Sequence, residues 1–125
     1  MEKIHLEQAK LWFEAAQHIA NLQESQRYAV AIALVVHAII KANDALTWKF
    51  SNITAKRHDD ARRLFEDLIK KNVINAEYAR CKQIIQDAID VKARAEYRGG
   101  YFSKSDYDKL ARKAETFLEM AGKVV

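Results

Sequence analysis

The near absence of helix-breaking residues is the feature that most constrains this chain. Its 125 residues include no proline and only three glycines, two of which are adjacent at Gly99 and Gly100. Because proline and glycine are the residues that most often interrupt a helix, long helices can form almost anywhere along the sequence. Half of the residues are hydrophobic, and the length suits one core. We therefore expect a single all-α domain over residues 1–125.

Hydrophobic periodicity predicts two helices in the first half of the chain. The stripe of the first comprises Leu6, Ala9, Phe13, Ala16 and Ala20, widened by Trp12 and Ile19. The second is expected to run from an N-cap at Ser25 to about Trp48. Its apolar residues cover nearly the whole circumference over residues 28–36, so it should be the central helix. His37 follows and is expected to be a hydrogen-bonded polar group of the core.

Three further helices are expected after a loop over residues 50–57. The third has acids Asp59 and Asp60 in its first turn and lysines in its last, as the helix dipole favours. The fourth has a stripe of Ile74, Tyr78, Cys81, Ile85, Ala88 and Ile89, and should end before the glycine pair. Ser103 and Asp106 form a capping box at the start of the fifth.

Long helices with short connections favour an antiparallel up-and-down bundle, here of four long helices and a shorter third one. The predicted common core includes one or two large apolar residues from each helix. These are Phe13, Ile32, Leu64, Phe65, Ile85 and Phe117.

The single cysteine, Cys81, excludes an internal disulfide and a zinc site built from several thiolates of one chain. We expect neither a metal nor another cofactor, and a reducing cytoplasm fits best. Acids and a histidine occupy the first residues, where an export signal would need an apolar run. The most apolar stretch, residues 28–36, is short for a membrane helix, so we expect no membrane span.

Basic residues gather in and around the third helix, although the net charge is only +4. They are Lys56, Arg57, Arg62, Arg63, Lys70 and Lys71. Such a patch can attract phosphates. The acids Asp59, Asp60, Glu66 and Asp67 offset much of this charge, and a mixed helix face is also typical of simple solvent exposure.

Two segments of the sequence resemble HEPN domains. In residues 29–65, an alanine-rich helix ends in an Ala-Asp-Ala-Leu-like element at Asp44, Ala45 and Leu46, and His58 then opens the next helix. In residues 91–121, an arginine and an acid-tyrosine pair precede a glycine turn and an A-x-x-F-L helix. The matching residues are Arg94, Glu96, Tyr97, Ala114, Phe117 and Leu118. The resemblance implies a helical bundle that commonly dimerises.

The resemblance also implies two alternative functions. HEPN ribonucleases carry an arginine followed four to six residues later by a histidine, and none of His5, His18, His37 and His58 follows an arginine at that distance. The first alternative is therefore a non-catalytic module that binds nucleotides, RNA or a minimal nucleotidyltransferase. The second is a divergent metal-independent ribonuclease or toxin with its site at a dimer interface.

Four residues are the candidate ligand-binding group: Asp44, Arg57, His58 and Arg94. They occupy the positions most like the HEPN elements, and a functional surface predicts that they converge at one end of the bundle. Arg57 offers a fork of donors and His58 a titratable donor for phosphate. A structural alternative pairs Asp44 with Arg94 to tie two helices together.

Overall fold

The computed structural model describes residues 1–98 and 101–125, and these residues are all-α. Five α-helices and one 3-10 helix account for most of them: α1 Glu2–Ala20, α2 Arg27–Ser51, α3 His58–Lys70, η1 Ala76–Cys81, α4 Lys82–Arg98 and α5 Lys104–Val124. No strand occurs within these ranges. The predicted stop at Gly99 and Gly100, and the side chains of Glu96 and Tyr97, lie outside what the structure describes.

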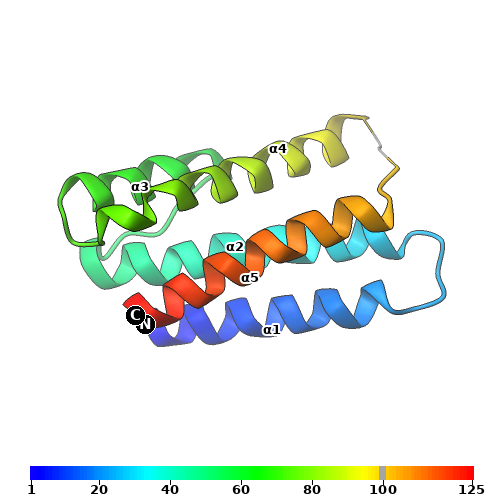
Figure 1. Cartoon of the computed structure of the whole chain (residues 1–125), viewed down its shortest axis with the longest axis horizontal. Helices are drawn as coiled ribbons and strands as arrows, with labels where there is room; N and C mark the ends of the chain where they lie inside the picture. The colour runs from blue at the N-terminus through cyan, green and yellow to red at the C-terminus, as the bar shows by residue number, and fades with distance from the viewer. Residues whose placement is uncertain (99–100) are drawn as a thin grey trace.

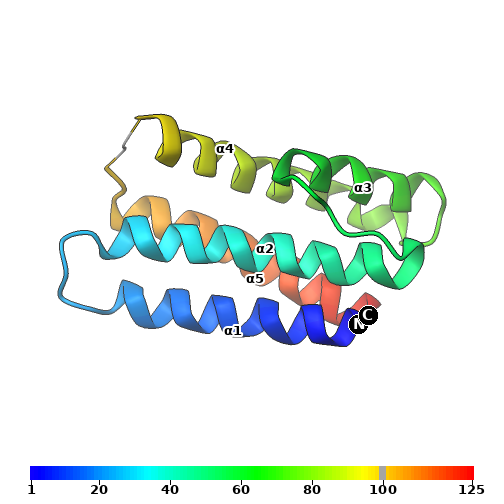
Figure 2. The same ribbon diagram turned by 180° about the vertical axis from the view of Figure 1, so that it is seen from behind.

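The helices pack around α2 (Figure 1). α1 runs along one side of α2, and the contact between these two helices is more extensive than that of any other helix pair described. α5 also packs on α2. α3 and α4 lie together on the side opposite α1, as the reverse view also shows (Figure 2). The two termini meet at one end, where the Lys49 ammonium donates to the carbonyl oxygens of Val124 and Val125 at 2.8 and 3.1 Å.

One apolar cluster contains residues from every α-helix. Five of the six predicted core residues belong to it, and Leu64 is buried outside it. The predicted stripe of α1 is confirmed at Leu6, Ala9, Phe13 and Ala16. Trp12 was placed with that stripe, but it is 38% exposed. The burial of α2 is also less complete than expected, because Val30 and Ala33 are exposed.

Helix boundaries follow local chemistry at most ends. The Ser103–Asp106 capping box of α5 is confirmed, with Asp106 N–H donating to Ser103 Oγ at 3.1 Å and Ser103 N–H donating to the Asp106 carboxylate at 2.9 Å. The Ser25 cap is wrong, because α2 begins after Gln26 without a side-chain cap. At its other end α2 stops at Asn52, whose φ of 53° lies in the left-handed region that asparagine tolerates.

The expected fourth helix is divided in the structure. Ile74 lies in the connection after α3, and Tyr78 and Cys81 lie in η1 rather than in α4. The Asn75 side chain accepts the Glu77 N–H at 2.9 Å and so caps the 3-10 segment. Cys81 is buried as its place in the stripe predicted, and burial raises the pKa of its thiol, which disfavours the reactive thiolate.

Among the described residues, α2 is the one helix long and apolar enough to cross a membrane. The apolar window is longer than residues 28–36, because the helix continues through His37 to Ser51. Within the fold, 67% of its most apolar 18-residue window is buried. Burial against the other helices accounts for this composition, since a core helix meets the same criteria.

Candidate functional site

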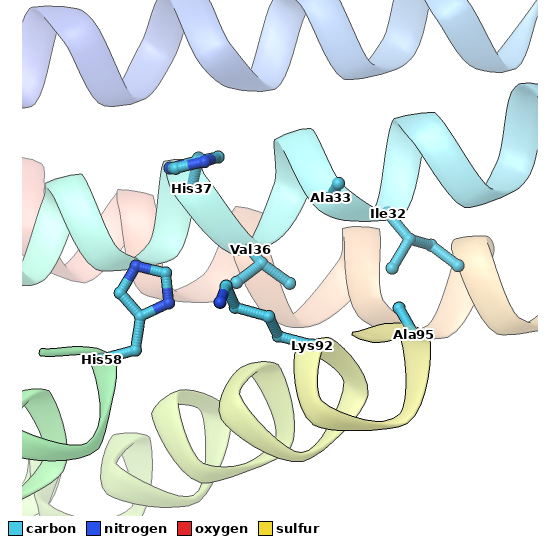
Figure 3. A pocket seen from close by; sticks show the side chains of 7 residues that line it. All are labelled: Ile32, Ala33, Val36, His37, His58, Lys92 and Ala95. Carbon is cyan, nitrogen blue, oxygen red and sulfur yellow. The ribbon is translucent and has the colours of Figure 1, made fainter. Parts of the chain in front are cut away.

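A pocket of about 130 Å³ opens between α2, α3 and α4. Figure 3 shows its side chains: Ile32, Ala33, Val36, His37, His58, Lys92 and Ala95. The floor is aliphatic, whereas the two imidazoles and the Lys92 ammonium are its polar groups. An apolar lining with a few convergent polar side chains is the lining that ligand sites usually have, although most of those sites are larger.

Helical spacing explains how three elements supply this pocket. Two pairs of lining residues on α2 are four positions apart, Ile32 with Val36 and Ala33 with His37. The members of each pair therefore lie one above the other on the same side of the helix. Lys92 and Ala95 are similarly spaced on α4. His58 is the first residue of α3, directly after Arg57, whose extended backbone (φ −127°, ψ 149°) ends the connection from α2. The end of this connection thereby positions the His58 imidazole in the pocket.

Aromatic contacts link the pocket to the surface of α1. The ring of His37 stacks on the indole of Trp12, with ring centroids 5.1 Å apart and planes inclined by 23°. On its other side His37 meets His58 edge to face, at 6.0 Å and 89°. His37 was expected to be a polar group of the core, but its side chain is exposed. It lies instead where the pocket meets solvent.

The structure places the four predicted site residues in different surroundings. His58 lines the pocket, and Arg57 precedes it with an exposed side chain. Arg94 instead forms an ion pair with Asp106 at 3.7 Å and lies over the ring of Phe102 at 4.3 Å. The predicted convergence is therefore wrong for Arg94.

Asp44 belongs to a separate polar cluster on the α1 side of α2. Its carboxylate accepts the Ala55 N–H at 3.4 Å, and its charge interacts with Lys41 and His5. The ion pair with Arg94, offered as the structural alternative, is wrong. The neighbouring Asn43 donates from Nδ2 to the Ala61 carbonyl at 3.0 Å. These bonds tie α2 to the following connection and to α3, so this part of α2 has a structural role.

Burial dominates the electrostatics of this polar cluster. It raises the pKa of Asp44, although the Ala55 N–H and the nearby Lys41 and His5 act in the opposite direction. Burial also lowers the pKa of His5, helped by Lys41 and opposed by Asp44. Both side chains are thus shifted toward their neutral forms.

The Asp44 shift predicts a pH-dependent gain in stability for Asp44→Asn. A carboxyl whose pKa is raised in the folded state favours folding most below its unfolded pKa, and that contribution is lost as pH rises through the folded pKa. Asparagine has no charge to bury and can still accept the Ala55 N–H. The free energy of unfolding of the variant should therefore increase relative to that of the parent as pH rises above about 4, the ordinary aspartate pKa. Urea unfolding at several pH values measures this difference.

Asp90→Asn is the matched control, because Asp90 is exposed. It should leave the free energy of unfolding within about 0.5 kcal/mol of the parent at each pH. An Asp44→Asn variant that becomes less stable relative to the parent as pH rises would contradict a raised pKa for Asp44 in the folded state.

Two pocket residues, His37 and Lys92, were missed as site residues by sequence reasoning. The exposed positions Val30, Ala33 and His37 follow one another at helical spacing, which was the available signal for an outward face of α2. For Lys92 the sequence carries no such signal, because its role depends on how α4 packs on α2. Within residues 1–98 and 101–125, no group of three His, Cys, Asp or Glu side chains could hold a metal ion.

No known protein family matches the chain, and neither does any curated protein or solved structure.

Proposed function

We propose that this chain is a HEPN-type antiparallel up-and-down bundle of four long helices and a shorter one. The helix lengths support the proposal: α1, α2, α4 and α5 have 19, 25, 17 and 21 residues, against 13 for α3. The resemblance carried by Asp44 and His58 supports it further, since Asp44 lies in the second half of α2 and His58 opens α3. A cytoplasmic protein with no membrane span is part of the same proposal.

We propose that the chain acts as a non-catalytic module that binds nucleotides or RNA through phosphate, in the pocket between α2, α3 and α4. The observation that carries the proposal is the meeting of two imidazoles and an ammonium, from three helices, in one apolar pocket. Lysine and protonated histidine are donors to phosphate oxygens, and an apolar floor strengthens such bonds by excluding water. Arg57 directly precedes His58 and has an exposed side chain, so it would add a fork of donors. A minimal nucleotidyltransferase would be a partner consistent with this role.

The test compares the affinity of the parent for phosphate-containing ligands with that of a variant that lacks two of the donors. His58→Ala/Lys92→Met should weaken binding of a labelled RNA oligonucleotide and of ATP by about tenfold or more, because charge-assisted hydrogen bonds contribute roughly 1.5–3 kcal/mol each. Binding by the parent should weaken as the salt concentration rises, because salt screens the attraction between the Lys92 ammonium and phosphate. Fluorescence anisotropy and calorimetry measure these affinities.

The control variant is His18→Ala/Lys10→Met, which removes the same groups from exposed positions on α1. It should bind like the parent. Equal affinity of the parent and of a folded His58→Ala/Lys92→Met variant, checked by circular dichroism, would refute the proposed site.

We also propose a homodimer, because α1 leaves large apolar side chains in solvent. Leu11 is 64% exposed, and Ile4 is 50% exposed on the same helix. A C2 dimer would be the usual closed arrangement. Light scattering should give twice the chain mass at micromolar concentration, and Ile4→Glu/Leu11→Glu should halve it. A parent that is monomeric at that concentration would contradict the proposal.

A further inference from the structure

The contact between Trp12 and His37 joins the pocket to an open aromatic surface. Trp12 comes from α1, which supplies none of the side chains that line the pocket, yet its indole stacks on an imidazole that does line it. The indole is 38% exposed, and His37 is also exposed. Trp12, His37 and His58 therefore form a continuous series of rings from the α1 surface to the start of α3.

The two ends of this series have different chemistry. At the α3 end, His58 and Lys92 share the pocket, and in Figure 3 the Lys92 side chain extends toward His58. The Lys92 ammonium and an imidazole N–H are suitable donors to a phosphate. At the α1 end, the indole offers a flat π surface without a charge, which suits a nucleobase because every base can stack on an aromatic ring.

We infer that Trp12 is a base-stacking residue that makes the pocket selective for unpaired nucleotides, and hence for single-stranded nucleic acid. The inference rests on the proposed phosphate site. It adds a contact to the nucleobase, which the phosphate donors do not bind. A phosphate held at His58 and Lys92 leaves the adjoining base beside the His37 and Trp12 rings. In a duplex, both faces of each base are covered by its neighbours, so the indole cannot reach them.

The burial pattern of α1 supports this role for Trp12. The residues of α1 that pack into the core are Leu6, Ala9, Phe13 and Ala16. Trp12 is not among them, although it is one of the largest apolar side chains of the chain and lies next to Phe13 in sequence. An indole that is partly exposed and stacks on a side chain of the pocket is better placed to meet a planar ligand than to fill the core.

The experiment compares three probes of equal length: a single-stranded RNA oligomer, its duplex, and an abasic oligomer that has the same phosphates but no bases. Trp12→Ala should weaken binding of the single strand by about tenfold or more. It should leave the affinity for the abasic oligomer unchanged, because that probe has nothing to stack. The parent should prefer the single strand to the duplex, and Trp12→Phe should retain most of this preference.

Leu22→Ala is the matched control, since Leu22 is a large apolar side chain that is 37% exposed, almost the same fraction as Trp12. It should bind all three probes as the parent does. In a Trp48→Phe background, emission from Trp12 should fall when the single strand binds and stay constant with the abasic oligomer.

Two results would overturn the inference while leaving the phosphate site intact. One is a folded Trp12→Ala variant that binds the single strand as well as the parent, with the His58→Ala/Lys92→Met variant still impaired. The other is a Trp12→Ala variant that loses affinity for the single strand and the abasic oligomer equally, which would show a structural effect. If the parent binds none of the probes, the proposed function fails, and the inference fails with it.

Discussion

Phe65→Ala should lower the free energy of unfolding by about 3–5 kcal/mol, the range for removing a fully buried phenylalanine. Phe65 is 0% exposed and belongs to the apolar cluster shared by all five α-helices. Its ring lies 5.9 Å from that of Phe117, so it connects α3 to α5. Truncation would remove this contact and leave a cavity that the rigid helices on either side cannot fill. Urea unfolding followed by circular dichroism measures the loss.

Tyr101→Ala is the control for loss of an aromatic ring, because Tyr101 is 86% exposed and lies outside the helices. It should change the free energy of unfolding by no more than about 0.5 kcal/mol. A Phe65→Ala loss near zero would mean that α3 does not pack on the core as described.

The buried stripes of α1, α3 and α5 could be predicted because they depend on local sequence. Residues three and four apart share a helix face, so Leu6, Phe13 and Phe65 could be placed without knowing the neighbouring helix. The capping box at Ser103 is local in the same way, since its bonds span three residues. Such features need only the chain on either side of them.

The division of the fourth helix could not be predicted from apolar spacing. A residue three positions along lies on the same side of both an α-helix and a 3-10 helix, so Tyr78 and Cys81 fit either. The distinguishing feature is the Asn75 side chain, which caps η1 through the Glu77 N–H. Asparagine can make that bond in several turn types, and its presence alone did not select one.

The candidate site was only partly predictable because its members are brought together by tertiary packing. His58 is a candidate from the HEPN resemblance, in which a histidine opens the third helix, and it does line the pocket. Asp44 was the predicted partner of Arg94, but the sequence alone does not determine which acid an arginine meets. In the structure Arg94 pairs with Asp106, a carboxylate that is also held by the α5 capping box. Lys92, two residues earlier, faces the pocket instead. Nothing in the local pattern of α4 distinguishes these two cations.

The helices α1 and α2 bury several alanines, whose small side chains allow a close contact between helices. The buried alanines of the two helices are Ala9, Ala16, Ala31, Ala38, Ala42 and Ala45, all 0% exposed. Small residues allow two helices to approach closely, and this pair has the most extensive contact in the fold. Added volume at such a position must displace one of the helices or force a strained rotamer.

Ala16→Leu should therefore lower the free energy of unfolding by about 1–3 kcal/mol, and Ala15→Leu provides a control on the adjacent residue. Alanine and leucine are both strong helix formers, so the two substitutions change helix propensity alike. Ala15 is exposed, whereas Ala16 is buried. The difference between the variants in urea unfolding thus measures packing at the contact with little contribution from the helix itself. If both variants were as stable as the parent, a closely packed α1–α2 pair would be contradicted. An equal loss of stability in both variants would instead indicate that the outer face of α1 is also covered.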